Sequence, residues 1–311
     1  MIGIIGAGAF GGALAITLGA KQPVTLWGRG QSGRGIARLP GAELPALVTV
    51  AEDVAEVARF ETVLLALPAQ AMGWFLADHS AMFPRTRLVA CCKGVDLTTG
   101  LGPTGVIAAH CPDAVAAILT GPSFASDIAK GLPTALTLAC AEDTVGEALQ
   151  HQLSTEVLRL YRTTDVTGAE FGGALKNVIA IAAGVVIGAG LGESARAALM
   201  TRGFAEMKRL ALHLGAQSET LSGLSGFGDL VLTCTSLQSR NFRFGTALGA
   251  GTPFDTSVTV EGVATASAVA TLARKLGVEM PVTQMVAGLT QDRISLEDAI
   301  RALMSRPLKQ E

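Results

Sequence analysis

The segment that most restricts the fold of this chain is its first eighteen residues. Residues 2–18 read IGIIGAGAFGGALAITL, an apolar run followed by Gly6, Gly8 and Gly11 in the spacing G-x-G-x-x-G and then by a helical pattern. The three glycines would allow a tight turn, a close backbone approach to a pyrophosphate and close helix–strand packing. In a chain with 37 glycines the spacing alone is weak, and a plain strand–helix turn is the alternative. Because the G-x-G-x-x-G motif stands at the start of alternating strands and helices, it strongly predicts dinucleotide binding.

Short apolar runs alternate with helical patterns over the first half of the chain. Continuous apolar runs of this length are typical of parallel strands that are buried on both faces. We expect strands at 2–6, 24–27, 62–67, 87–92, 116–121 and 134–140, and helices at 10–20, 51–58, 69–77 and 142–152. This alternation predicts βαβ units and a doubly wound, Rossmann-type α/β sheet.

The pattern changes near Thr164. Beyond it strand-like runs are no longer found, and long helical patterns cover 168–189, 193–214, 218–231 and 260–276. The sequence therefore predicts a dinucleotide-binding α/β domain over residues 1–164 and an all-helical substrate-binding and catalytic domain over residues 165–311.

Charge and composition exclude several classes of function. The 24 basic and 26 acidic residues give a net charge of −2, which argues against nucleic-acid binding. The five cysteines and four histidines have no ligand spacing, so we expect no metal site and a reducing, cytoplasmic compartment. Residues 1–20 include six glycines, and the uncharged run after Asn177 is shorter than the ~20 residues a bilayer requires. We expect no membrane span; the Gly-rich helices would permit a homodimer without requiring one.

The second expected strand bears on the choice of cofactor. It ends LWGRG, with Arg29 and no acidic residue in the place where NAD-binding proteins usually hold the ribose hydroxyls. An arginine there can pair with a 2′-phosphate, which favours NADP(H), with NAD(H) as the second choice. A solvated surface arginine is the competing interpretation.

Lys176 lies in a segment, EFGGALKNVIAIAAGVVIGAG, that is otherwise almost entirely apolar after Asn177. At helical spacing it shares a face with Gly172, Gly173 and Ala180, whose small side chains leave room for another molecule. Desolvation lowers the pKa of a lysine and makes it a usable proton donor near neutral pH. The alternative is a lysine whose ammonium group extends to water.

Other polar residues lie in contexts typical of ligand binding. The run SRN places Ser239, Arg240 and Asn241 together, and a hydroxyl, a guanidinium and an amide can bind a phosphate. A helix N-cap followed by a surface arginine explains the same run. Four more candidates follow expected strands or lie in a glycine-rich turn. They are Lys93 in CCKGV, Gly121 and Ser123 in GPSFAS, and Asp229 in GLSGFGDLVL, where no basic residue is near in sequence.

These motifs, in this order, resemble the NAD(P)-dependent glycerol-3-phosphate dehydrogenases of the bacterial type. The likeness covers nearly the whole chain and rests on GAGAFGGALA, LPAQA, CKGV, GPSFA, FGGALKNVIAIAAG, ARAALMTRGFAEM, GLSGFGDLVLTCTSLQSRN and VEGVATA.

The resemblance implies interconversion of dihydroxyacetone phosphate and sn-glycerol 3-phosphate, for phospholipid synthesis in the cytoplasm. It gives Lys176 the role of proton donor/acceptor and makes Asp229 its catalytic partner. The substrate would be held by Lys93, Gly121, Ser123, Ser239, Arg240 and Asn241. The cofactor would be contacted by Gly6, Gly8, Ala9, Phe10, Gly11, Arg29, Lys93, Ala125, Arg240 and Glu261.

The chain departs from the family pattern at a few positions. Ile187 stands where the family has an acid before Gly188, and Ser194 stands where it has asparagine. The region after Arg29 is also shorter and lacks the asparagine before L-P. We expect Ser194 to lie near enough to the site to alter the rate or the fit of the substrate, while Lys176, Asp229 and the SRN run are all present.

Two other functions are consistent with parts of the sequence. A sister dehydrogenase acting on 3-hydroxy acids would also carry a lysine on the first helix of its second domain, but it would not need the SRN cluster. A catalytically inactive NADP-binding sensor would need neither Lys176 nor Asp229.

Overall fold

The computed structural model describes residues 1–304 and contains two compact units. The first unit comprises Met1–Ala174 and Ala211–Leu232. The second comprises Leu175–Leu210 and the described residues from Thr233 onward. The boundary expected after residue 164 stays a prediction.

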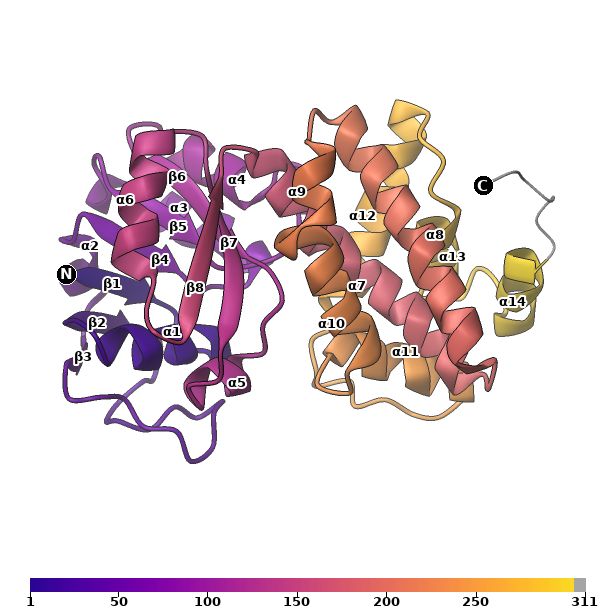
Figure 1. Cartoon of the computed structure of the whole chain (residues 1–311), viewed down its shortest axis with the longest axis horizontal. Coiled ribbons are helices and arrows are strands. Elements are labelled where there is room, and N and C mark those ends of the chain that lie inside the picture. Colours follow the sequence, from indigo (N-terminus) through magenta and orange to yellow (C-terminus); the bar gives the residue numbers. More distant parts are fainter. Residues whose placement is uncertain (305–311) are drawn as a thin grey trace. The chain divides into compact units, whose positions relative to one another are not determined.

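The first unit is built on an eight-stranded sheet with strand order β3-β2-β1-β4-β5-β6-β7-β8 (Figure 1). Its strands are β1 Ile2–Ile5, β2 Val24–Trp27, β3 Val48–Val50, β4 Thr62–Leu65, β5 Arg87–Ala90, β6 Val115–Thr120, β7 Thr134–Cys140 and β8 Leu158–Thr163. All neighbours pair in parallel except β6 and β7. The strand order reverses between β1 and β4, and ligands of such sheets bind at the carboxyl ends beside that point. The doubly wound fold is confirmed.

Two strands were absent from the sequence prediction, and both lie at sheet edges. β3 has only three residues, too few to give a pattern. β8 reads LRLYRT, in which buried leucines alternate with exposed residues. Continuous apolar runs indicate strands that are buried on both faces, so edge strands with one exposed face do not show this pattern.

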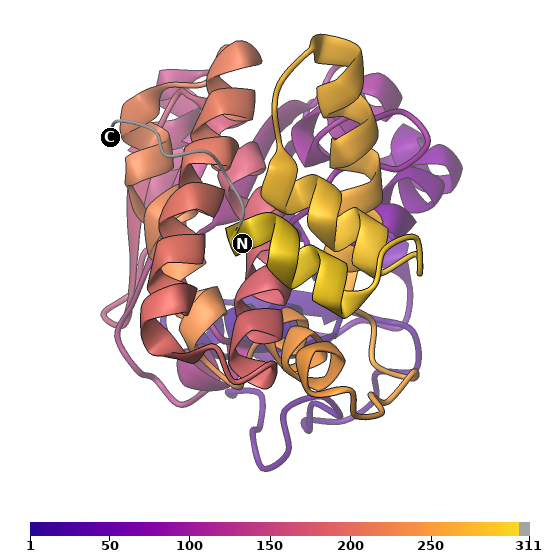
Figure 2. The same ribbon diagram turned by 90° about the vertical axis from the view of Figure 1, so that its right-hand side faces the viewer.

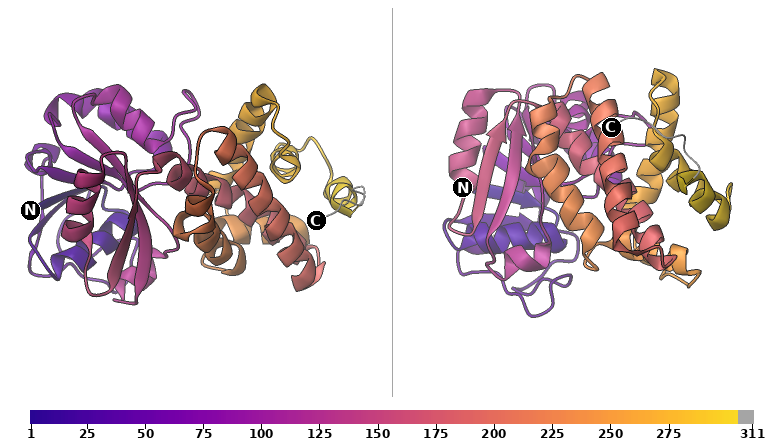
Figure 3. Two further views of the ribbon diagram at one scale, coloured as in Figure 1. Left: turned by 45° about the horizontal axis from the view of Figure 1, so that its top comes forward. Right: turned by 45° about the vertical axis from the view of Figure 1, so that its right-hand side comes forward.

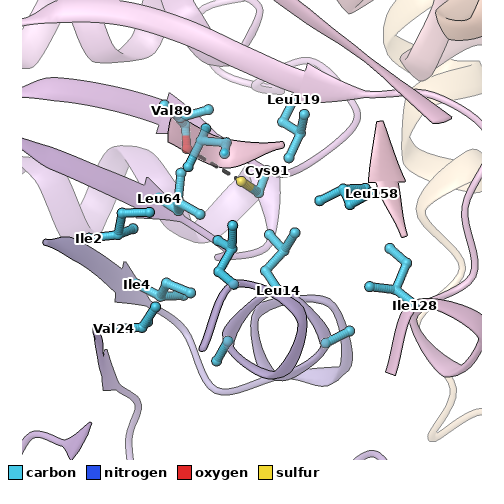
Figure 4. Packing of buried hydrophobic residues seen from close by; sticks show 14 of the residues in the cluster. Ile2, Ile4, Leu14, Val24, Leu64, Val89, Cys91, Leu119, Ile128 and Leu158 are labelled. Atoms are coloured by element: carbon cyan, nitrogen blue, oxygen red, sulfur yellow. Dashed lines mark hydrogen bonds between the residues drawn. The ribbon is translucent and has the colours of Figure 1, made fainter. Parts of the chain in front are cut away.

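Helices cover both faces of the sheet (Figure 1; Figure 3). On one face α1 Ala9–Gly19, α5 Ala125–Ala129 and α6 Asp143–Leu153 bury side chains against Ile4 and Leu64, as Figure 4 shows for part of this cluster. On the other, α2 Val54–Ala58, α3 Ala69–His79, a 3-10 turn Ser80–Met82 and α4 Pro103–His110 follow the strands, and Ile5 and Leu65 lie in that cluster. Successive strand residues therefore point into opposite cores, as parallel strands buried on both faces require.

The remaining helices follow β8 along the chain (Figure 2). They are α7 Val166–Gly188, α8 Gly192–His213, α9 Ser218–Ser222, a π-helical turn Leu224–Gly228, α10 Asp229–Thr235, α11 Arg240–Ala250, α12 Glu261–Leu276, α13 Pro281–Leu289 and α14 Leu296–Met304. The single helix expected over 218–231 is wrong. Gly223, Gly226 and Gly228 interrupt it, and a Cβ atom at Gly226 would collide with the Leu221 carbonyl oxygen.

Helix α7 is long and apolar enough to cross a membrane by length and composition. It is the one helix among residues 1–304 that meets this test, and 89% of its apolar window is buried within the fold. Burial of this extent is typical of a core helix.

Helices α7 and α11 pack through glycines. Gly184 and Gly188 on α7 face α11, and Gly245 and Gly249 on α11 face α7; a Cβ atom at any of them would collide with a backbone carbonyl oxygen of the other helix. The two backbones are therefore as close as glycine allows.

We expect Gly245→Ala to lower the free energy of unfolding by about 2 kcal/mol, because the added methyl group would fall on the Ile181 carbonyl oxygen and push the helices apart. Gly146→Ala on α6 is the control, since its Cβ atom would meet only Cys140 Cβ at 3.4 Å. That change should leave stability equal or raised, as alanine favours helices. Urea unfolding of both variants measures the difference, and equal midpoints would contradict the tight packing.

Candidate active site

The glycine-rich turn after β1 has the geometry needed to hold a pyrophosphate. Gly6 has φ +110°, and a side chain there would collide with the Ala66 carbonyl oxygen. A Cβ atom at Gly11 would fall on the Gly6 carbonyl oxygen, whereas one at Gly8 would meet nothing within 4 Å. Helix α1 begins immediately after Gly8 without a side-chain cap, which leaves its first N–H groups open to an anion. The residues present therefore fit a dinucleotide.

A cavity of ≈ 480 Å³ lies at the carboxyl ends of β2 and β3. Residues 27–33 and 50–52 line it, and Arg29 is among them with its side chain exposed. This is where a Rossmann-type fold holds the adenosine ribose of its cofactor. Ala9 and Phe10, which open α1, and Ala125, which opens α5, are partly buried against the sheet core.

Lys93, Gly121, Ser123 and Asp229 are brought together in the first unit. Lys93 Nζ donates to Asp229 Oδ2 at 2.6 Å and to the Gly121 carbonyl oxygen at 2.9 Å. Asp229 is fully buried, so its carboxylate is held where an ion pair is little screened. No basic residue is near Asp229 in the sequence, and Lys93 reaches it in the fold from 136 residues away.

Backbone geometry at the end of β6 supports this cluster. Gly121 has φ +131°, a conformation that other residues rarely adopt, and its carbonyl oxygen also accepts a hydrogen bond from Ser123 Oγ at 3.4 Å. Beside it, Thr120 buries a hydroxyl group that has no hydrogen-bond partner within residues 1–304.

A further acid, the partly buried Glu170, lies on α7. Its carboxylate accepts the Thr104 N–H at 2.7 Å at the first turn of α4. Burial raises the pKa of the Glu170 carboxyl, and the hydrogen bonds from Thr104 oppose this shift only in part. The folded protein therefore keeps the Glu170 proton at pH values where the unfolded chain has released it.

We expect Glu170 to lower stability as pH rises. Its stabilising contribution is complete below the ordinary glutamate pKa of about 4.3 and is lost as pH climbs through the raised pKa of the folded state. Glu170→Gln keeps an acceptor for Thr104 and removes the partly desolvated charge. The variant should therefore be more stable than wild type at pH 8, by about 1 kcal/mol in urea unfolding. Parallel pH–stability curves for the two proteins would contradict this.

Lys176 is buried, with 6% of its surface exposed, on α7. Its Nζ donates to Thr233 Oγ1 at 2.8 Å, and Thr233 is itself buried on α10. Thr233 was not singled out from the sequence. The signal that could have found it is its position four residues after Asp229, on the same face of one helix.

The SRN run begins α11. Ser239 is its N-cap, with Oγ accepting the Phe242 N–H at 3.2 Å, and Asn241 Oδ1 accepts the Gly262 N–H at 2.9 Å. Both residues are buried, so the capping alternative describes Ser239 correctly. The hydroxyl proton of Ser239 and the NH₂ group of Asn241 still can donate, and the helix N-terminus favours an anion.

Arg240 differs from its two neighbours because 47% of its side chain is exposed. Its guanidinium lies 3.8 Å from the carboxylate of Glu261, the first residue of α12. Lys176, Thr233, Ser239, Arg240, Asn241 and Glu261 all belong to the second unit.

Two of the departures from the family pattern, Ile187 and Ser194, lie on α7 and α8. Ile187 is eleven residues further along α7 than Lys176, about 16 Å at the helical rise. Ser194 is exposed in the first turn of α8. Distance along the helix therefore separates Ile187 from the lysine.

The first unit has a Rossmann-type sheet with a glycine-rich turn that can accept a pyrophosphate, and the helix that follows β8 carries a buried lysine. These features are those of a nicotinamide-dependent dehydrogenase. Two family models match: the N-terminus of the NAD-dependent glycerol-3-phosphate dehydrogenases over residues 1–146, and the C-terminus of the same family over residues 165–301. The chain belongs to the NAD-dependent glycerol-3-phosphate dehydrogenase family, and the resemblance inferred from its motifs is confirmed.

Similar proteins cover the whole chain. A protein of Cereibacter sphaeroides named glycerol-3-phosphate dehydrogenase [NAD(P)+] is 67% identical over 100% of both chains, and one of Paracoccus denitrificans with the same name is 63% identical over 100% of this chain and 99% of its own. The crystal structure of glycerol-3-phosphate dehydrogenase from Coxiella burnetii superposes with a TM-score of 0.92 at 35% identity and 98% coverage of each chain.

Proposed function

We propose that this protein interconverts dihydroxyacetone phosphate and sn-glycerol 3-phosphate with a nicotinamide dinucleotide. The observation that carries the proposal is the buried Lys176, held by Thr233 in a chain 67% identical end to end to a protein named for this reaction. A cofactor of the nicotinamide class supplies the hydride that reduces the carbonyl carbon.

The protein's own residues would manage the proton and the phosphate. Lys176 would protonate the carbonyl oxygen as it gains negative charge, with Asp229 as its acidic partner. The hydroxyl of Ser239, the amide of Asn241 and the guanidinium of Arg240 would hold the phosphate at the start of α11, which orients the ketone. Lys93, with Gly121 and Ser123, would contact the remaining polar atoms of the substrate.

The dinucleotide would be held by the turn at Gly6, Gly8 and Gly11, with Ala9, Phe10, Ala125, Lys93, Arg240 and Glu261 as further contacts. NADP(H) is our preferred cofactor, because Arg29 lines the cavity at the end of β2 and can pair with a 2′-phosphate. We place the reaction in the cytoplasm, where its product would supply phospholipid synthesis.

The test is an absorbance assay of NADPH and NADH oxidation by dihydroxyacetone phosphate. Unphosphorylated dihydroxyacetone is the matched control, and we expect it to react at least a hundredfold more slowly because the phosphate contacts position the ketone. Intact NADPH binding without turnover of the phosphorylated ketone would overturn the proposal. A 3-hydroxy acid would then be the substrate class to test.

A further inference from the structure

The cavity at the ends of β2 and β3 carries two opposite charges. Ten residues of the described part of the chain line it, and of these only Arg29 and Glu52 are charged. Glu52 follows β3, the three-residue strand that the sequence pattern did not predict, and so it was not among the expected site residues. Both side chains are exposed.

The backbone holds Glu52 in place. The Ala51 N–H donates to the Leu26 carbonyl oxygen at 2.9 Å, which joins the end of β3 to the end of β2. The Glu52 N–H donates to Glu56 Oε1 at 2.9 Å, within the capping box that starts α2. The Glu52 backbone is therefore fixed from both sides by contacts that do not involve its own carboxylate.

Neither charge is neutralised within the protein. In the part of the chain that the structure describes, the Glu52 carboxylate and the Arg29 guanidinium have no hydrogen bond or ion pair, either with each other or with a third residue. An acid and a base that line one cavity without pairing both remain available to a ligand in it.

We infer that Glu52 is a specificity-determining residue that keeps the protein able to use both NADH and NADPH. The inference rests on the proposed function, in which the cavity takes the adenosine ribose. A carboxylate accepts hydrogen bonds from ribose hydroxyls, which favours NADH, and it repels a 2′-phosphate, which opposes the attraction of Arg29. Discrimination between two ligands is a difference of affinities, so one repulsive group reduces the preference that Arg29 creates.

The variant Glu52→Gln tests this, because it removes the charge and nearly keeps the shape. We expect the Kd of NADPH, from fluorescence titration, to fall about threefold to tenfold and that of NADH to rise or stay constant. The ratio of kcat/KM for the two cofactors should move in the same direction. The shift should shrink at 0.5 M salt because the groups are exposed.

Two further variants control the experiment. Glu147→Gln on α6 makes the same charge change at an exposed position outside the cavity, and it should leave the Kd ratio unchanged. Arg29→Met should move the ratio toward NADH.

An unchanged Kd ratio in Glu52→Gln, or an equal change for both cofactors, would overturn the inference. Failure of the proposed function would appear separately, as wild-type protein that binds both cofactors but does not turn over dihydroxyacetone phosphate.

Discussion

Replacing Lys176 by methionine should lower kcat for reduction of dihydroxyacetone phosphate about 10³-fold and leave the Kd of NADPH unchanged. The carbonyl oxygen needs a proton as hydride arrives, and a positioned general acid contributes typically 10²–10⁴-fold. Methionine fills most of the volume of the lysine stem, so packing in α7 should be kept. Steady-state kinetics and cofactor titration on the same preparation measure both quantities.

A control and a partner variant sharpen this test. Lys275→Met, at an exposed position near the end of α12, should have no effect on kcat. Thr233→Val removes one hydrogen-bond acceptor of Lys176 and should lower kcat by about tenfold, less than the loss of the lysine, because the ammonium remains. More than a tenth of wild-type kcat in Lys176→Met would mean that another group donates the proton.

The parts of the fold that could be predicted are those governed by local rules. The turn at Gly6, Gly8 and Gly11 follows from steric needs of one strand–helix unit, and the central strands follow from burial on both faces. Arg29 could be placed at the carboxyl end of the sheet because it lies two residues after the strand Val24–Trp27. Local periodicity suffices for such features, since each depends on neighbours within a few residues.

The features that the sequence did not predict depend on contacts between segments that are distant in the chain. Lys93 and Asp229 pair across 136 residues, and no spacing in the sequence predicts that. Thr233 becomes notable only when Lys176 is seen to donate to it. Glu52 gains its place from β3, whose three residues pair with β2 and carry no pattern of their own. Edge strands and tertiary ion pairs are the features that single-sequence reasoning misses here.

The ion pair between Lys93 and Asp229 should have a large effect on stability. Asp229→Asn should lower the free energy of unfolding by about 3 kcal/mol, because it removes the charged partner of a lysine whose side chain is only 20% exposed. Lys93→Met alone should also destabilise, since it leaves the fully buried Asp229 carboxylate without the ammonium that donates to it at 2.6 Å.

The double variant separates the pair from its surroundings. Lys93→Met with Asp229→Asn leaves no unpaired charge from this pair, so it should be less destabilised than the sum of the single variants, by about 2 kcal/mol. Urea unfolding of the four proteins at one pH measures this coupling energy. If the single effects simply add, Lys93 and Asp229 do not stabilise each other, and the 2.6 Å contact would then matter for binding substrate rather than for the fold. If the pair matters only for substrate binding, both single variants should have a raised KM for dihydroxyacetone phosphate and unchanged stability. A residue used only for binding alters the affinity for substrate and does not move the unfolding midpoint.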